Sequence, residues 1–150
     1  GGTYNPETDE RFVGCVGWGM TYNGTPVTPG TRKNLDGALV LASRSEVSRG
    51  EWECFRKETF KIKPVGSVAY KLALVAAGFA DATWTFKPKN EWDVAAGVAL
   101  LKAAGGTAYL IDGGVPSFNN ENPLISGLIA HPVSLQDSVR AVLFEKPGLD

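Results

Sequence analysis

Two predicted helix starts carry the side chains most suited to chemistry. At the first, Gly66 and Ser67 precede a predicted helix, and Lys71 follows four residues after Ser67, so the hydroxyl and the ammonium group share one helix face. Free backbone N–H groups, a hydroxyl and an ammonium group together suit an anionic or hydroxylated ligand. At the second, Asp93 lies in the first turn of the next helix, and a carboxylate is a hard oxygen ligand that Mg²⁺ accepts.

Each of these residues also has a purely structural interpretation. Glycine and serine before a helix commonly form only the turn and the cap. Asp93 is typical of a first-turn acid that the helix dipole stabilises. Arg44, between two serines after a predicted strand, could contact a phosphate, although a surface arginine is the commoner case; Lys87 and Lys89 are expected to be solvated. Spacing alone therefore leaves the choice open.

The second helix is the clearest element of the chain. It is predicted over residues 91–104, with Asn90 as its N-cap and Gly105 just past its C-terminus. Its body is almost entirely apolar, which is typical of a helix that is buried on several sides. A carboxylate at the start of such a helix is either a cap or a ligand.

From residue 36 onward, predicted strands alternate with predicted helices. This alternation predicts an α/β fold, with helices on both faces of a mostly parallel sheet. Ligands of such sheets bind at the carboxyl ends of the strands, where both candidate helices begin. Strands are predicted at 38–42, 59–63, 82–86, 107–111 and 125–130, and helices at 51–57, 68–77, 91–104 and 134–144.

The first thirty residues follow a different pattern. Short strands at 3–5 and 11–13 and a turn at Asn23-Gly24 predict an antiparallel meander, and residues 26–33 are predicted to form a linker. A small meander needs another layer to be stable. We therefore divide the chain into residues 1–33 and an α/β domain at residues 34–150.

Composition excludes several classes of protein. The 150 residues carry a net charge of −1, with 43% hydrophobic and 21% charged residues, which is typical of a globular domain and gives no sign of a nucleic-acid surface. No apolar run approaches the roughly 20 residues that span a membrane. Cys15 and Cys54 are too few for a disulfide framework, which favours a reducing, cytoplasmic setting. His131 is expected to be a satisfied or solvated loop histidine, and the absent initial methionine favours a fragment or a processed product.

Two long motifs resemble one family. Residues 92–97, Trp-Asp-Val-Ala-Ala-Gly, followed by Ala-Ala-Gly-Gly at 103–106, resemble the C-terminal signature of the inositol monophosphatase superfamily. Residues 66–72 and 75–81 match the segment that precedes this signature. The hairpin region and residues 126–130 are also similar, so the resemblance covers the whole chain.

The resemblance implies a fold and an activity. Members are Mg²⁺-dependent, often lithium-sensitive phosphomonoesterases with an αβαβα fold, of which this chain would supply the C-terminal αβα layers behind an antiparallel hairpin. Asp93 would be a metal ligand, and Gly66, Ser67 and Val68 would line the sugar or inositol side of a small phosphorylated substrate. Clustered Mg²⁺ ions would activate a water and orient the phosphate. A homodimer is also in keeping with the family.

Two motifs of the family are missing. Its other metal ligands lie in an earlier glutamate pair and in an Asp-Pro-x-Asp-Gly-Thr motif, and residues 34–38, Asn-Leu-Asp-Gly-Ala, are a poor match to the latter. The chain therefore resembles the last strands of a first domain followed by a complete second domain. We expect it to need a missing N-terminal domain and to be close to inactive alone.

The resemblance also helps to choose between two candidate substrates. Lysine at the place of Lys71 is typical of the 3′(2′),5′-bisphosphate nucleotidases, where it meets the second phosphate. Residues 43–46, Ser-Arg-Ser-Glu, resemble a nucleotidase motif that contains Arg44, although Glu46 replaces its histidine. Phe86 stands where the inositol branch often has a glutamate. We therefore favour a bisphosphate nucleotidase over an inositol-1-monophosphatase, with a non-catalytic phosphate-binding module as the alternative from another class.

Overall fold

The computed structural model describes residues 1–145, so the last five residues of the predicted domain 34–150 lie outside the described residues. The first four strands form an antiparallel meander in the order β1-β2-β3-β4. These strands are β1 (Gly2–Asn5), β2 (Glu10–Cys15), β3 (Gly19–Tyr22) and β4 (Thr25–Val27). The predicted linker at 26–33 is therefore wrong at its start, because Pro26 lies in β4, an edge strand that tolerates proline.

A five-stranded sheet forms the centre of the molecule, in the order β6-β5-β7-β11-β9. Its strands are β5 (Leu39–Ser43), β6 (Lys61–Val65), β7 (Ala82–Thr85), β9 (Gly106–Leu110) and β11 (Leu128–Pro132). β5 is parallel to β6 and β7, whereas β11 is antiparallel to both of its neighbours. Four of the five strands thus run in the same direction, and β11 runs against them. The sheet was predicted to be mostly parallel, but only two of its four neighbouring strand pairs are parallel. No helix joins β9 to β11 within the described residues, and a strand that returns without a crossover helix pairs antiparallel.

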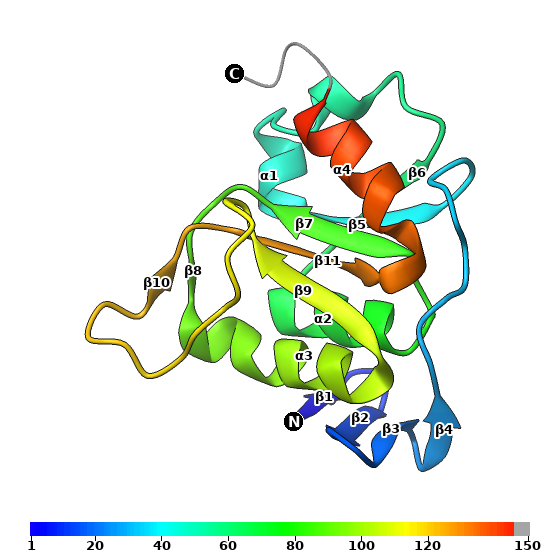
Figure 1. Cartoon of the computed structure of the whole chain (residues 1–150), viewed down its shortest axis with the longest axis vertical. Coiled ribbons are helices and arrows are strands. Elements are labelled where there is room, and N and C mark those ends of the chain that lie inside the picture. The colour runs from blue at the N-terminus through cyan, green and yellow to red at the C-terminus, as the bar shows by residue number, and fades with distance from the viewer. Residues whose placement is uncertain (146–150) are drawn as a thin grey trace.

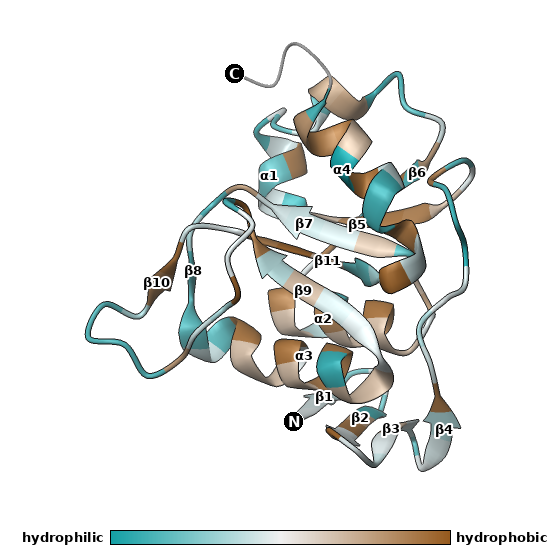
Figure 2. Ribbon diagram, in the orientation of Figure 1, coloured by the Kyte–Doolittle hydropathy of each residue, from teal (hydrophilic) through white to brown (hydrophobic). Residues whose placement is uncertain are grey.

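Four layers are stacked in the molecule (Figure 1). α2 (Val68–Ala76) and α3 (Glu91–Ala104) cover one face of the central sheet, and the meander packs outside them through Phe12 and Met20. α1 (Arg44–Ser48), α4 (Gln136–Phe144) and two 3-10 turns, η1 (Glu53–Phe55) and η2 (Val133–Leu135), occupy the other face. Figure 2 shows apolar residues on the sheet-facing sides of these helices and along β11. The predicted α/β class and layering are confirmed.

Several predicted elements need correction. The predicted helix at 51–57 is wrong: the chain forms α1 earlier, turns at Gly50 with φ 78°, and then makes only the short turn η1. The conformation of this irregular stretch is set by the burial of Trp52 and Phe55 in the core, and not by a helical repeat of apolar residues. The predicted strand at 125–130 is split into β10 (Leu124–Ile125) and β11 by Gly127, whose φ is 141°. β10 pairs with β8 (Lys89–Asn90), just ahead of α3.

The helices predicted at 68–77 and 91–104 are confirmed, although α2 ends one residue earlier than predicted, at Ala76. Gly105 ends α3 in the left-handed conformation, at φ 86°. Ser67 caps α2, because its Oγ accepts a hydrogen bond from the backbone N–H of Tyr70 at 3.2 Å. Within residues 1–145, no helix has the length and apolar character needed to span a membrane.

α2 and α3 approach each other closely at Gly97. A Cβ atom placed on Gly97 would lie 2.5 Å from the Cβ of Leu72, so only glycine allows this contact. Both helices connect strands of the same direction, so both run opposite to those strands and begin at the same edge of the sheet. Gly97 therefore brings two helix starts side by side.

We predict that Gly97→Ala destabilises the chain by about 1–3 kcal/mol because the new methyl group overpacks against Leu72. In an unconstrained helix, replacing glycine by alanine normally raises the free energy of unfolding by about 1 kcal/mol, so the expected effect at Gly97 has the opposite sign. The measurement is urea unfolding of a double-mutant cycle with Leu72→Gly, which removes the Cβ atom of Leu72 together with the rest of the clashing side chain. In the Leu72→Gly background the Gly97→Ala change should cost less or should stabilise, and equal costs in both backgrounds would contradict the proposed contact.

Candidate functional site

Three parallel strands end at one edge of the central sheet and place the predicted site residues there. β5, β6 and β7 end at Ser43, Val65 and Thr85, and α1, α2 and α3 begin beyond these ends. α1 packs on one face of the sheet and α2 on the other, so the chain changes faces beside β5. Such a topological switch point is where open α/β sheets bind their ligands.

A pocket of about 420 Å³ lies at this edge, and we call it the switch-point pocket. Val68, Ala69 and Trp92 complete its wall. Its polar lining consists of three hydroxyl groups, two ammonium groups and one carboxylate, from Ser43, Ser45, Ser67, Lys71, Lys89 and Asp93. The structure thus brings Ser67, Val68, Lys71 and Asp93, which come from two predicted helix starts, into one pocket.

Arg44 and Gly66 lie in a neighbouring hollow of about 810 Å³, which shares Ser67 and Ala69 with the switch-point pocket. The guanidinium group of Arg44 lies against Gly66, where a Cβ atom would come 2.2 Å from Nη2. Gly66 is therefore the residue that lets Arg44 cross this loop. The next residue, Ser67, is held at φ 61°, a left-handed conformation that is uncommon for serine.

Lys71 is almost completely buried, with 4% of its surface exposed. Its Nζ donates to the backbone O of Val65 at 3.5 Å, and this is the one acceptor that the described part of the chain gives it. Burial lowers the pKa of Lys71 to about 8, while the charge of Glu46 raises it and the charges of Lys89 and Arg44 lower it further. An ammonium group with unfilled donors at a pocket wall is suited to an anion.

Glu46 is the functional candidate that the sequence reasoning undervalued. Its side chain is buried directly after β5 and accepts hydrogen bonds from the indole Nε1 of Trp52, at 3.2 Å, and from the hydroxyl of Thr85. Lys89 Nζ lies 3.5 Å from Glu46 Oε1, so Lys89 is not simply solvated. The match of residues 43–46 to a known motif was the available signal, and the departure at Glu46 obscured it.

Asp93 is exposed, and its carboxylate lines the switch-point pocket. Asn90 Nδ2 donates to Asp93 Oδ2 at 3.5 Å. Asn90 occupies the predicted N-cap position of α3, but its side chain makes no capping hydrogen bond to the helix backbone. An available carboxylate at a helix start fits one ligand position of Mg²⁺, which takes its remaining ligands from water, phosphate or other groups. Residues 1–145 contain no group of three or more His, Cys, Asp or Glu side chains placed to hold a metal ion.

Glu91 fixes the start of α3 on which Asp93 lies. Its buried carboxylate accepts hydrogen bonds from the side-chain amide and backbone N–H of Asn120 and from the backbone N–H of Asn119. The bond from the Asn120 side chain is the main cause that lowers the pKa of Glu91. The backbone N–H of Glu91 also donates to the O of Pro123 at 2.8 Å, so the loop before β10 clamps this helix start.

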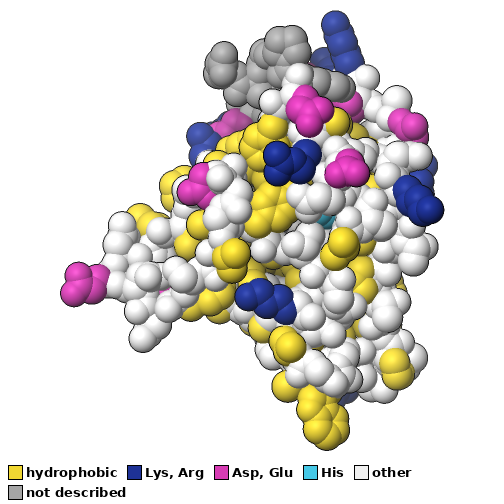
Figure 3. Space-filling view, viewed as in Figure 1, with side chains coloured by type: hydrophobic (Ala, Val, Ile, Leu, Met, Phe, Trp, Pro, Cys, Tyr) yellow, Lys and Arg dark blue, Asp and Glu magenta, His cyan; other side chains and the backbone are white. Residues whose placement is uncertain are grey.

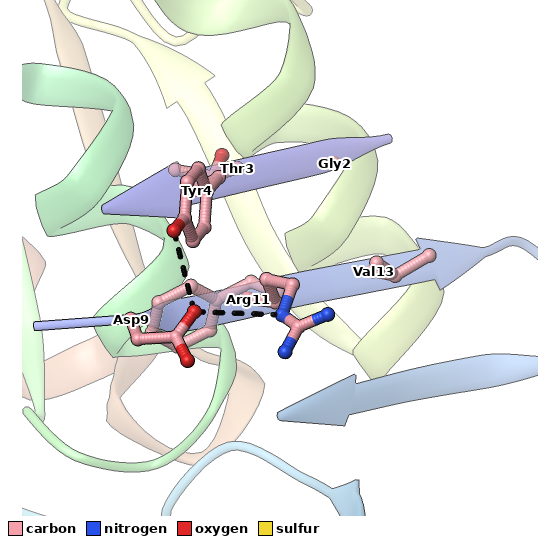
Figure 4. Close-up of a pocket in the computed structure, with 7 residues that line it drawn as sticks. Gly2, Thr3, Tyr4, Asp9, Arg11 and Val13 are labelled. Carbon is pink, nitrogen blue, oxygen red and sulfur yellow. Dashed lines mark hydrogen bonds and ion pairs between the residues drawn. The ribbon is translucent and has the colours of Figure 1, made fainter. Parts of the chain in front are cut away.

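Another hollow, of about 580 Å³, lies on the outer face of the meander (Figure 4). There the Asp9 carboxylate accepts a hydrogen bond from Tyr4 and lies 3.8 Å from Arg11 Nε, and both charged side chains are exposed. Their charges already meet each other and solvent, which makes this a weaker ligand site than the switch-point pocket. On the face shown in Figure 3, basic and acidic side chains are interspersed.

His131 has a structural environment. It is fully buried in β11, where Nδ1 lies 2.8 Å from the O of Pro132 and Nε2 lies 3.1 Å from the hydroxyl of Tyr109. Burial lowers the pKa of His131, which keeps the ring neutral. The prediction of a satisfied histidine is confirmed, although in a strand and not in a loop.

Comparison with known proteins gives consistent matches. A family model described as the inositol monophosphatase family matches residues 1–143. Inositol-1-monophosphatase of Rhizobium meliloti is 33% identical over 118 residues, which cover 74% of this chain and 44% of that protein. Nus factor SuhB of Pseudomonas aeruginosa is 34% identical over 111 residues, which cover 68% of this chain and 41% of that protein.

A solved structure of an inositol monophosphatase from Anabaena (Nostoc) sp. PCC 7120 aligns with a TM-score of 0.81 and 28% identity. The alignment covers 99% of this chain and 59% of that chain. This chain therefore spans about half the length of the curated relatives it matches.

Proposed function

Because this chain belongs to the inositol monophosphatase family, we propose that it is the substrate-binding half of a Mg²⁺-dependent phosphomonoesterase. The observation that carries the proposal is the buried Lys71 ammonium group, which lines the same pocket as the exposed Asp93 carboxylate. One group suits the anionic substrate and the other suits a hard cation.

In this proposal the charged residues of the switch-point pocket divide two tasks, the binding of a metal ion and the binding of an anion. Asp93 holds one Mg²⁺ ion, and bound Mg²⁺ would supply charge neutralisation of the phosphate and activation of a water. The N–H groups at the start of α2 and the ammonium groups of Lys71 and Lys89 bind and orient anionic oxygens. Glu91 keeps the start of α3 fixed, so that Asp93 needs no rearrangement to bind the ion.

One carboxylate cannot complete a site for several metal ions. We propose that the remaining ligands come from a domain outside this chain, with residues 1–33 as its last strands and linker and residues 34–150 as the C-terminal domain. The exposed Tyr4 and Val13 on the outer face of the meander provide apolar surface for such a domain. A homodimer contact is the alternative use of exposed apolar residues at the β2–β3 turn, where Trp18 is 91% exposed.

For the substrate, we propose a 3′(2′),5′-bisphosphorylated nucleoside. Two phosphates need more cationic groups than one, and Lys71, Lys89 and Arg44 gather around the pocket and the neighbouring hollow. Phe86 is 43% exposed at the place where inositol phosphatases often have a glutamate. Inositol 1-phosphate is the second candidate, because curated relatives are named inositol-1-monophosphatase.

The first test concerns Asp93 and is made in the full-length parent enzyme. Asp93→Asn should lower Mg²⁺-dependent phosphate release by about two orders of magnitude or more, because the amide is a poor Mg²⁺ ligand. The matched control is Asp137→Asn, which changes an exposed first-turn acid of α4 far from the pocket in the chain. Near-normal turnover of Asp93→Asn at saturating Mg²⁺ would remove Asp93 from the metal site.

The second test concerns Lys71. Lys71→Met keeps the length and the apolar stem but deletes the charge, so kcat/KM for 3′,5′-bisphosphoadenosine should fall roughly ten- to a hundredfold. Inositol 1-phosphate, which has no second phosphate, should be affected much less. For the wild-type enzyme, kcat/KM for the bisphosphate should fall as pH rises through about 8, because Lys71 then loses its proton.

The exposed Lys102 of α3 provides the control for this variant, and Lys102→Met should leave both substrates unaffected. Equal losses on both substrates in Lys71→Met would instead assign Lys71 to the shared phosphate or to the fold. Unchanged kinetics on both would show that Lys71 does not contact the substrate.

A further inference from the structure

We propose that Glu46 is a positioning residue that holds Lys89 at the switch-point pocket and serves as the counter-charge for Lys89 and Lys71, as a preformed anion clamp. The inference rests on the proposed function in one respect, namely that the anion is a phosphate group. Glu46 itself is not part of the pocket lining, so its carboxylate leaves the place of the anion free.

The carboxylate of Glu46 is fixed from the core of the molecule. Trp52 donates to Oε2 from its indole Nε1, and its ring stacks on Trp84 at a centroid distance of 5.3 Å and an interplanar angle of 14°. Both rings are buried. Thr85, at the end of β7, donates its hydroxyl to Oε1, so both carboxylate oxygens are bound by buried donors and the group cannot rotate freely.

Lys89 reaches this fixed carboxylate from the connection between β7 and α3. Its backbone is set by pairing with Ile125 in the β8–β10 ladder, and its Nζ lies 3.5 Å from Glu46 Oε1. Only 20% of the Lys89 side chain is exposed, in contrast to 53% for Lys87, which pairs with Glu51 at the same distance. The Coulomb attraction within an ion pair shielded from water in this way is screened less than that within a surface pair.

Lys71 depends on the same carboxylate through its charge. The charged groups that act on it are Glu46, Lys89 and Arg44, and Asp93 also lines the pocket. Among the groups that act on it, Glu46 alone favours the protonated ammonium, whereas burial and the two cations disfavour it. Without the Glu46 charge, the buried Lys71 and the half-buried Lys89 would lack this counter-charge, and Lys71 would tend to lose its proton.

This arrangement lets the pocket present two ammonium groups without reorganisation when an anion arrives. Groups that are already held in the bound geometry lose less conformational entropy on binding. Thr85 and Trp52 hold the Glu46 carboxylate by hydrogen bonds, and this carboxylate does not line the pocket that is open to ligand. Glu46 thus acts through the lysines and does not contact the substrate.

The test is Glu46→Gln in the 150-residue chain, which removes the charge and keeps the shape of the side chain. Lys71 is titrated by NMR through its ¹³Cε resonance, and inorganic phosphate binding is measured in parallel. The Lys71 midpoint should fall by about half a pH unit or more, and the Kd for phosphate at pH 8, where the wild-type Lys71 is about half protonated, should rise about twofold or more. At a pH low enough to protonate Lys71 in both proteins, the difference in Kd should shrink.

Glu51→Gln is the matched control, because it removes the neighbouring Lys87 ion pair, which has the same N–O distance. It should change neither the Lys71 midpoint nor the phosphate affinity. An unchanged Lys71 midpoint in a folded Glu46→Gln chain would overturn the proposal, as would equal effects of the two variants.

A second measurement covers the case in which Glu46→Gln does not fold. In the wild-type chain, the ammonium protons of Lys89 should exchange with water more slowly than those of the exposed Lys102. Equal exchange rates would contradict the clamp. Neither measurement depends on turnover, so a parent enzyme without nucleotidase activity would refute the proposed substrate while leaving the Glu46 result standing.

Discussion

Parallel pairing of β5 with β6 and β7 forces the carboxyl ends of three strands to one edge of the sheet, and every candidate site residue depends on this constraint. The chain leaves that edge three times, toward α1, α2 and α3. The close contact of α2 and α3 at Gly97 then sets the distance between two of the helix starts. Side chains from residues 43 to 93 therefore share one pocket because of backbone topology and one glycine.

Charge balance in the pocket follows from this geometry. Lys71, Lys89 and Asp93 line the switch-point pocket. Glu46 lies outside this lining, contacts Lys89, and is bound by Trp52, whose ring stacks on Trp84. Burial makes the Lys71 ammonium easy to neutralise, which a fixed carboxylate offsets. The pocket thus places the ammonium groups of Lys71 and Lys89 beside the carboxylate of Asp93, and in our proposal the lysines bind the anion and Asp93 binds the metal ion.

Periodicity and cap residues were sufficient to predict α2, α3 and the meander, because local signals such as Gly105 and Asn23-Gly24 coincide with the final structure. They failed for residues 51–57, where Trp52 and Phe55 are held by tertiary contacts and not by helix periodicity. For the same reason, the role of Glu46 was hidden from the sequence. Its partners Thr85 and Lys89 lie about forty residues away in the chain, and only the β5–β7 pairing brings them together.

We propose that the starts of α1, α2 and α3 form one phosphate-binding site. An ¹⁵N–¹H NMR titration of this chain with 3′,5′-bisphosphoadenosine in the presence of Mg²⁺ would detect such a site residue by residue. The largest amide shifts should fall at Ser45, Ser67, Val68 and Asp93 and should be lost at high salt. Shifts confined to the outer face of the meander, or no saturable shifts at these residues, would contradict it.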